Sequence, residues 1–190
     1  MKRIIPIVLI LLFFAACSSS PAAPHVTEPV TQPQEPTLSA QEPTISLSSS
    51  FPFSFSTEDL HGNQVTEYSL GEYDFFFVYY WATWCRACIN SMPSLTQLAE
   101  EFGDRVGFIS LLGDFDMSRN AAINITENAN IPFITVNALI EELDGLMELL
   151  TSGFLPTSVI VDRNGNVIGE QIIGGSMERM QAAINYALQQ

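Results

Sequence analysis

The feature that most constrains the fold is an uninterrupted apolar run that leads into a pair of cysteines. Residues 74–81 read Asp-Phe-Phe-Phe-Val-Tyr-Tyr-Trp, and Cys85 and Cys88 follow closely. Aromatic and β-branched residues favour strands, and a run without polar alternation is typical of a strand that is covered on both faces. Apolar side chains then recur at helical spacing, at Cys88, Met92, Leu95, Leu98 or Ala99, and Phe102. The cysteine pair is therefore expected where a buried strand gives way to a helix.

The rest of the chain beyond residue 50 alternates between strand and helix patterns. Apolar segments at 106–112 and 134–136 indicate strands, and the periodicity of 117–128 and 141–150 indicates helices. Ser176 can cap a last helix, whose apolar face would consist of Met177, Met180, Ile184, Ala187 and Leu188. This alternation predicts an α/β domain with a central sheet.

Two hairpins are expected at the ends of this domain. Phe53 and Phe55 alternate with serines as in a half-buried strand, and the turn 61–63 leads into 64–66, which suggests an N-terminal hairpin. Segments 157–162 and 166–173 are predicted to pair around the turn at 163–165. These elements complete one core over 51–190 without a second domain.

The first 50 residues have the composition of a leader and a linker. Residues 1–16 combine a basic start, an apolar run that is too short to span a bilayer, and small residues before Cys17. We expect a signal peptide over 1–16 and a lipidated Cys17, with an ordinary secreted protein cut near Ala16 as the alternative. Residues 17–50 are rich in Pro, Ser, Thr, Gln and Glu, which predicts a disordered tether. A diacylated cysteine would anchor the protein stably in a membrane.

The net charge excludes one class of partner. The formal charge is −14, and loss of Lys2 and Arg3 with the signal peptide would leave five arginines against 21 acidic residues. Nucleic acid binding needs a basic patch that displaces counterions from phosphates. No nucleic acid partner is therefore expected, and the acidity is interpreted as favouring solubility.

The chemistry of the cysteine pair depends on its position. A structural zinc site needs four ligands, whereas this chain has no second Cys pair and only His25 and His61 besides. At the start of a helix, unpaired N–H groups and the helix dipole favour a thiolate. We therefore expect Cys85 to be the nucleophile and Cys88 to be the resolving thiol of a redox pair, with no metal and no other cofactor.

The motifs around this pair resemble a known family. The segment Trp-Ala-Thr-Trp-Cys-Arg-Ala-Cys (81–88), with Pro93 in the following helix, is similar to the membrane-anchored TlpA/ResA-like branch of the thioredoxin superfamily. Leu-Pro-Thr (155–157) and Asp-Arg-Asn-Gly-Asn-Val-Ile-Gly (162–169) resemble its cis-proline loop and closing hairpin. The resemblance covers about 51–190. It implies a thioredoxin-like fold, with a central mixed sheet flanked by helices, an N-terminal β-hairpin and a central helical insertion within 120–153.

The resemblance also implies the substrate-binding residues. In that family the proline is cis and faces the redox pair, and the residue before it receives the substrate chain; these are Pro156 and Leu155 here. Trp84, Arg86 and Ala87 complete the expected contact surface. Trp81 is expected either to flank the site or to pack in the core.

Two positions depart from the family pattern. Thioredoxin has a buried Asp where this chain has Tyr79, and ResA-like proteins have a Glu where it has Ser91. The general base of the resolving step is therefore not identified by the sequence. Arg86 beside the thiolate would raise the reduction potential and favour an oxidant, whereas the family's usual role is that of a reductant.

The function predicted from these motifs is that of an extracytoplasmic, membrane-anchored thiol:disulfide oxidoreductase. We expect it to reduce disulfides in exported proteins, as in cytochrome c maturation, with electrons from a membrane donor and as a monomer. The alternatives are a disulfide oxidant, a peroxiredoxin-like antioxidant and a non-catalytic binding lipoprotein. A peroxidatic Thr-x-x-Cys is missing, because Ala82 lies three residues before Cys85.

Overall fold

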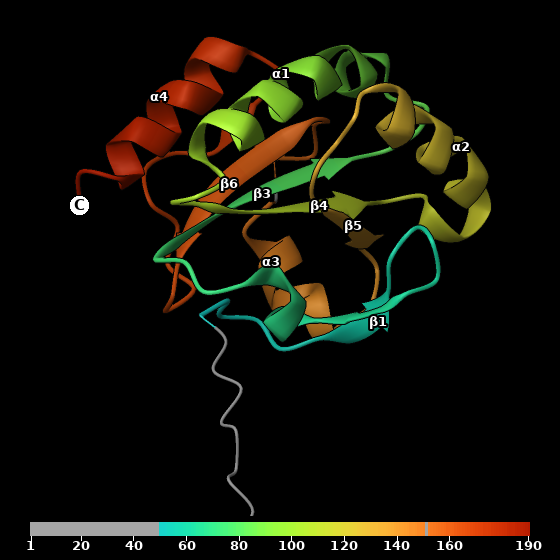
Figure 1. The fold of residues 1–190 in the computed structure, drawn as a ribbon, viewed down its shortest axis with the longest axis horizontal. Coiled ribbons are helices and arrows are strands. Elements are labelled where there is room, and N and C mark those ends of the chain that lie inside the picture. Colours follow the sequence, from blue (N-terminus) through green and yellow to red (C-terminus); the bar gives the residue numbers. More distant parts are fainter. Residues whose placement is uncertain (1–49, 151) are drawn as a thin grey trace, which may run out of the picture. The chain divides into compact units, whose positions relative to one another are not determined.

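The apolar run forms β3 (Phe75–Trp81), the central strand of a five-stranded mixed sheet in the computed structural model, which describes residues 50–150 and 152–190 (Figure 1). The strand order is β5-β4-β3-β6-β7, with β4 at Gly107–Leu112, β5 at Ile134–Asn137, β6 at Thr157–Asp162 and β7 at Ile172–Ile173. β3 pairs in parallel with β4 and antiparallel with β6. The predictions for the signal peptide, for Cys17 and for the tether up to residue 49 lie outside the described residues.

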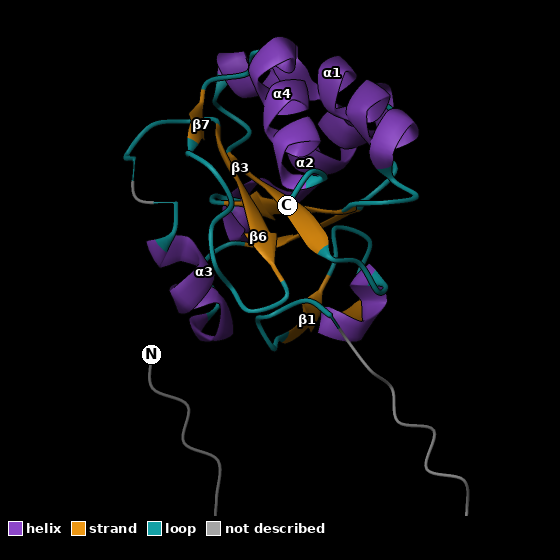
Figure 2. Ribbon diagram, turned by 90° about the vertical axis from the view of Figure 1, so that its left-hand side faces the viewer, coloured by secondary structure: helices purple, strands orange, loops and turns teal. Residues whose placement is uncertain are grey.

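Both faces of the sheet are covered, as the unbroken apolar run predicts. Figure 1 shows α1 (Arg86–Phe102), α2 (Phe115–Asn128) and α4 (Met177–Ala187) on one side of the sheet. Figure 2 shows the helix α3 (Asp144–Glu148) on the other side. Phe77, Tyr79 and Trp81 belong to the first core, whereas Phe76 and Val78 belong to the second. Alternate residues of one strand therefore supply two separate cores.

The N-terminal hairpin is confirmed, but its predicted start is wrong. β1 (Ser56–Glu58) pairs antiparallel with β2 (Gln64–Thr66), and the short 3₁₀ helix at Glu67–Leu70 follows. The segment before β1 is irregular, although its phenylalanines alternate. Phe51 and Phe55 are buried in the second core, where the ring of Phe51 contacts that of Phe76 with centroids 4.9 Å apart. Ring packing against the sheet thus replaces strand pairing in this segment.

The closing hairpin is only partly formed. β6 agrees with the prediction, but its expected partner over 166–173 is reduced to a bridge at Val167 and the two residues of β7. Gly169, between the bridge at Val167 and β7, has φ of 78°, in the left-handed region that glycine tolerates and that a regular strand does not use. The alternating pattern of this segment therefore predicted a longer strand than the backbone allows.

The remaining elements follow the sequence closely. α1 begins at Arg86 and continues through Pro93 to Phe102, and α4 has Ser176 as its N-cap, with the hydroxyl accepting from the Arg179 N–H. α2 starts two residues before its predicted start and contains a non-helical residue, Ser118. The helix predicted over 141–150 is divided into a 3₁₀ turn at Glu141–Leu143 and α3. None of the helices in the described part of the chain is long and apolar enough to cross a bilayer.

Candidate active site

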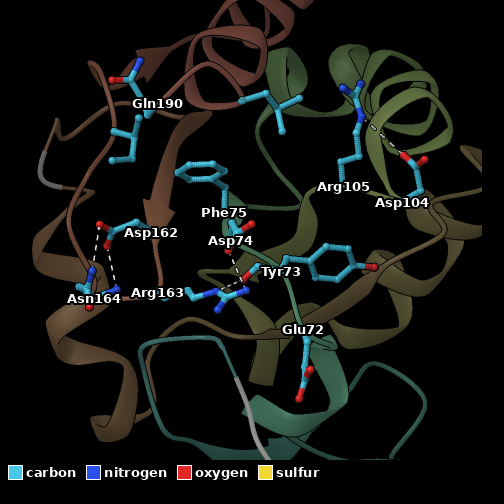
Figure 3. A pocket seen from close by; sticks show the side chains of 12 residues that line it. Glu72, Tyr73, Asp74, Phe75, Asp104, Arg105, Asp162, Arg163, Asn164 and Gln190 are labelled. Carbon is cyan, nitrogen blue, oxygen red and sulfur yellow. Dashed lines mark hydrogen bonds and ion pairs between the residues drawn. The ribbon is translucent and has the colours of Figure 1, made fainter.

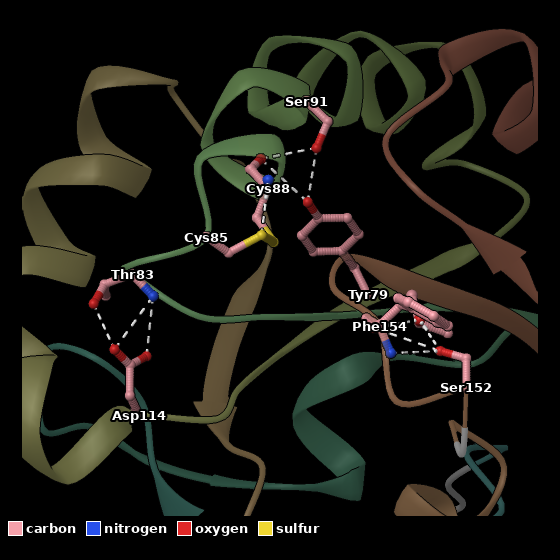
Figure 4. The surroundings of a disulfide bond; sticks show 9 residues. Tyr79, Thr83, Cys85, Cys88, Ser91, Asp114, Ser152 and Phe154 are labelled. Atoms are coloured by element: carbon pink, nitrogen blue, oxygen red, sulfur yellow. Dashed lines mark hydrogen bonds between the residues drawn. A yellow bond between two sulfur atoms is a disulfide. The ribbon is translucent and has the colours of Figure 1, made fainter.

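The two cysteines lie where β3 gives way to α1, and they are joined by a disulfide bond. The S–S distance is 2.04 Å and the Cα atoms are 5.2 Å apart (Figure 4). Cys85 is the N-cap of α1, with extended backbone angles, and Cys88 lies in the first turn of the helix. The short loop after Trp81 therefore places the pair at the carboxyl end of the central strand and at the amino end of a helix.

The two sulfurs differ in exposure and in hydrogen bonding. Cys85 is 7% exposed, whereas Cys88 is completely buried. The Cys88 N–H donates to the Cys85 sulfur over 3.1 Å. In the dithiol form this N–H group and the helix dipole would stabilise a Cys85 thiolate. Only Cys85 can meet a large substrate, and only its anion has a backbone donor in place.

A buried carboxylate fixes the loop before Cys85. The N–H of Thr83 donates to both carboxylate oxygens of Asp114 over 3.0 and 3.3 Å, and the Thr83 hydroxyl donates over 2.5 Å. Burial raises the pKa of Asp114, but the hydrogen bonds from Thr83 and Ser118 outweigh it and hold the pKa below its usual range. Asp114 is therefore ionised at neutral pH and ties the loop to the start of α2.

A pair of hydroxyl groups lies beneath Cys88. The hydroxyl of Tyr79 is 2.7 Å from that of Ser91 and 3.2 Å from the Cys88 carbonyl oxygen, and Ser91 donates to the same carbonyl over 2.8 Å (Figure 4). Tyr79 is completely buried. This burial raises the pKa of Tyr79 far above its usual range, and the bond with Ser91 offsets only part of the rise. Tyr79 is neutral at physiological pH and cannot act as a base.

The loop before β6 carries the predicted proline. The Leu155–Pro156 peptide bond is cis, as the resemblance implied. The Ser152 hydroxyl lies 2.6 Å from that of Thr157 and accepts from the Phe154 N–H, and the Thr157 hydroxyl donates to the Phe154 carbonyl. These bonds hold Phe154 with 63% of its surface exposed.

The other predicted contact residues are divided between surface and core. Trp84 is 73% exposed, and Arg86 and Ala87 are exposed beside it. Trp81 is buried, and its indole N–H donates to the Ser110 hydroxyl over 2.7 Å, so core packing is the correct alternative for this residue. Within residues 50–150 and 152–190, no three His, Cys, Asp or Glu side chains are grouped so that they could hold a metal ion.

One hollow in the described part of the chain lies away from the disulfide. It has a volume of about 790 Å³ and is lined at the start of β3 by Tyr73, Asp74 and Phe75, whereas the cysteines follow the end of that strand (Figure 3). Arg163 and Asp74 form an ion pair across it at 2.7 Å. This hollow is therefore separate from the site at the disulfide.

Together, the mixed sheet, the position of the disulfide and the cis proline are those of the thioredoxin class of folds. A model of the AhpC/TSA family matches residues 49–169, more than half of the chain, and the chain belongs to this family. The resemblance of the chain to TlpA/ResA-like proteins is supported by comparison with individual proteins. The thiol-disulfide oxidoreductase ResA of Bacillus cereus is 29% identical over 122 residues, which are 64% of this chain and 66% of that protein, just under two thirds of its length.

Two further proteins extend the comparison. ResA of Geobacillus kaustophilus is 28% identical over 136 residues, which cover 70% of this chain and 72% of that protein. Among solved structures, a thiol:disulfide interchange protein of the thioredoxin family from Chlorobium tepidum has a TM-score of 0.58 and 25% identity, over 73% of this chain and 96% of that one. The chain is thus a TlpA/ResA-like member of the thioredoxin superfamily.

Sequence reasoning missed three features of the site. It noted Tyr79, which precedes the cysteines, and Ser91, which follows them. It did not predict that the hydroxyl groups of these two residues are in contact. It did not identify Asp114, for which the only signal is a Gly-Asp step at the end of a predicted strand. It also overlooked Phe154, an isolated aromatic residue next to the predicted proline loop.

Proposed function

We propose that this protein is an extracytoplasmic disulfide reductase in which Cys85 attacks the substrate and Cys88 resolves the intermediate. The observation that supports this best is the Cys85–Cys88 disulfide itself, placed with Cys85 at the amino end of α1 and Cys88 buried behind it. This asymmetry suits a cycle in which one sulfur meets the substrate and the other stays protected until it is needed. No further cofactor takes part in the proposed reaction.

The reaction balances as two exchanges. The Cys85 thiolate attacks one sulfur of a substrate disulfide, and the other sulfur leaves as a thiolate that takes up a proton. The Cys88 thiol then loses its proton and attacks the Cys85 sulfur, which forms the intramolecular disulfide and releases the second substrate thiol. Two electrons and two protons pass to the substrate overall. A membrane dithiol donor would then reduce the Cys85–Cys88 disulfide for the next cycle.

The proposed substrates are exported proteins with disulfides, such as apocytochromes c. The exposed Trp84 and Phe154 offer apolar contacts for a polypeptide next to the disulfide, with Leu155 and Pro156 as the backbone-binding segment. Lipidation of Cys17 would anchor the protein to the membrane, and residues 18–50 would give the domain reach. We propose that it acts as a monomer.

A disulfide oxidant is the second candidate, and the exposed Arg86 beside Cys85 favours it. A positive charge and a helix amino end stabilise the thiolate, and therefore the dithiol form, which raises the reduction potential. A potential near about −120 mV would indicate an oxidant, and one near or below about −270 mV a reductant. Equilibration of the full chain with glutathione or dithiothreitol buffers measures this value.

The decisive experiment uses the full chain, expressed in a bacterium and purified in detergent. With dithiothreitol as donor it should reduce insulin disulfides and should not consume hydrogen peroxide. Cys85→Ser should abolish the insulin activity, and Cys88→Ser should accumulate mixed disulfides with substrate. Insulin reduction that survives Cys85→Ser would exclude the proposed role.

The third cysteine provides the matched control. Cys17→Ser should leave insulin reduction in detergent unchanged. The same substitution should abolish incorporation of labelled fatty acid and shift the protein out of the membrane fraction. Retention of both would contradict the proposed anchor without affecting the proposed catalytic pair.

A further inference from the structure

One buried hydroxyl of β6, on the strand next to β3, has no protein partner among the described residues. Ser158 is completely buried in β6, and its Oγ atom makes no hydrogen bond to any protein atom of the described residues. A buried hydroxyl without a partner costs free energy, so an orphan of this kind in a folded protein calls for an explanation. The position of Ser158 in the sheet supplies one.

Ser158 shares a sheet face with the groups beneath Cys88. It is directly opposite Tyr79 in the antiparallel pairing of β3 and β6, and side chains so placed have Cβ atoms about 4.5–5.5 Å apart on the same face. The Tyr79 hydroxyl reaches the Cys88 carbonyl and Ser91 in the first turns of α1. Ser158 therefore lies on the sheet face from which Tyr79 reaches α1, two residues after the cis proline Pro156.

The serine on the other side of Tyr79 provides a comparison, because its hydroxyl group has hydrogen-bond partners. Ser110 is opposite Tyr79 in the parallel pairing of β3 and β4, and it is buried on the same face. Its Oγ accepts from the Trp81 indole over 2.7 Å and from the Thr135 hydroxyl over 3.1 Å. Two serines therefore flank one tyrosine, and of these two only the serine on the strand that follows Pro156 is without a partner.

We propose that Ser158 is a positioning residue whose hydroxyl becomes the hydrogen-bond partner of the Cys88 sulfur when the Cys85–Cys88 disulfide is reduced. In the disulfide form the Cys88 sulfur is occupied by its bond to Cys85. Reduction turns it into a buried thiol that must lose its proton in the resolving step, and burial opposes the thiolate. The hydroxyls of Tyr79 and Ser91 are already bonded to each other and to the Cys88 carbonyl, which leaves Ser158 free to donate.

This arrangement makes the hydroxyl selective for one redox state. Ser158 contributes no protein hydrogen bond to the disulfide form and one to the dithiol form, so it raises the reduction potential of the pair. It takes no part in electron transfer, which remains between the cysteines and the substrate disulfide. The inference rests on the proposed redox cycle of the pair, but it does not depend on which protein is the substrate.

Ser158→Ala and Ser110→Ala, made in the full chain in detergent, test the proposal as a matched pair. Ser158→Ala should shift the equilibrium with dithiothreitol about fivefold toward the disulfide, which is about 20 mV more negative, because a tenfold change corresponds to 29.6 mV. It should lower the thermal unfolding midpoint of the dithiol form and leave that of the disulfide form unchanged or higher. Ser110→Ala should lower both midpoints and leave the potential within twofold of wild type.

Several outcomes would overturn the proposal. An unchanged potential in Ser158→Ala would mean that the hydroxyl has the same environment in both redox states, and a more positive one would mean that it favours the disulfide. Ser158→Thr, which keeps the hydroxyl, should restore the wild-type potential and serves as the test if the alanine variant does not fold. These measurements need no protein substrate, so a failure of insulin reduction with a normal Ser158 effect would refute only the proposed reductase function.

Discussion

The hydroxyl of Tyr79 lies 2.7 Å from that of Ser91, so the two positions at which thioredoxin and ResA-like proteins carry a buried carboxylate are in direct contact in this chain. Both groups are uncharged, because burial holds the pKa of Tyr79 far above its usual range. The fold therefore places a neutral hydrogen-bonded pair beneath Cys88 where related proteins have one acidic group. This pair buries two polar groups without burying a charge.

Removal of one member of this pair should destabilise the domain. Tyr79→Phe leaves Ser91 with its bond to the Cys88 carbonyl but deletes its partner, and we expect a loss of about 1 kcal/mol in the free energy of unfolding. Tyr80→Phe, the next residue of β3 and on its other face, is the control and should cost less. Urea denaturation measures both variants. An effect of Tyr79→Phe no larger than that of the control would contradict the role assigned to the pair.

Acid should release the loop that precedes Cys85. The pKa of Asp114 is lowered in the folded state, so its contribution to stability is present above the unfolded value of about 3.9 and is lost as the pH falls through the lower folded value. Asp114→Asn should flatten the acid limb of the stability profile. At neutral pH it should also change the rate at which Cys85 is alkylated in the reduced protein, because the bonds to Thr83 position this loop.

Asp162 provides the control for this prediction. Its pKa is also lowered, mainly by the Asn166 side chain, but it is the last residue of β6, at the opposite end of that strand from Pro156. Asp162→Asn should change the acid profile and leave the alkylation rate of Cys85 unaltered. Equal effects of the two substitutions on alkylation would show that Asp114 has no specific link to the site.

Substitution of the exposed aromatic residues beside the disulfide should lower the activity on large substrates only. Trp84→Ala and Phe154→Ala should each lower kcat/KM for insulin about tenfold, because buried aromatic anchors carry much of the energy of protein contacts. Their effect on a small disulfide such as oxidised glutathione should be less than twofold. Met117→Ala removes an even more exposed apolar side chain of α2 and should change neither rate. Parallel losses on both substrates would assign the aromatic residues to the chemistry and not to docking.

The sequence predicts the parts of this fold that depend on long apolar patterns. The run at 74–81 correctly specifies a central strand, β3, and the periodicity from Cys88 to Phe102 correctly specifies a helix, α1, which begins at Arg86. Both patterns need burial on a fixed face, so few alternative structures satisfy them. The cysteine pair is located by the same two elements.

The errors of prediction arise where tertiary contacts override a local pattern. The alternation of Phe53 and Phe55 fits a strand, yet the segment forms none and packs its rings on the sheet. The pairing of Tyr79 with Ser91 joins residues twelve positions apart on different elements, and that of Thr83 with Asp114 joins residues 31 apart. No spacing rule links such positions, because the distance between them is set by how α1 and α2 cross the sheet.

The contact between Gly175 and Ser91 leads to a last prediction about the same site. A Cβ atom added to Gly175 would lie 2.5 Å from the Ser91 Cβ and 2.8 Å from its hydroxyl. Gly175→Ala should therefore cost about 1–3 kcal/mol in the free energy of unfolding, whereas Gly145→Ala in α3, which has 3.7 Å to its nearest neighbour, should be neutral or stabilising. The neighbouring Gly174 N–H donates to the Pro156 carbonyl, so the shift would also displace the cis-proline loop and slow insulin reduction.

A double variant tests whether the collision with Ser91 causes this loss of stability. Ser91→Gly in the same chain removes the collision, so the double variant should be more stable than the sum of the two single effects predicts. Strict additivity of the two effects in urea denaturation would show that the two residues do not press on each other.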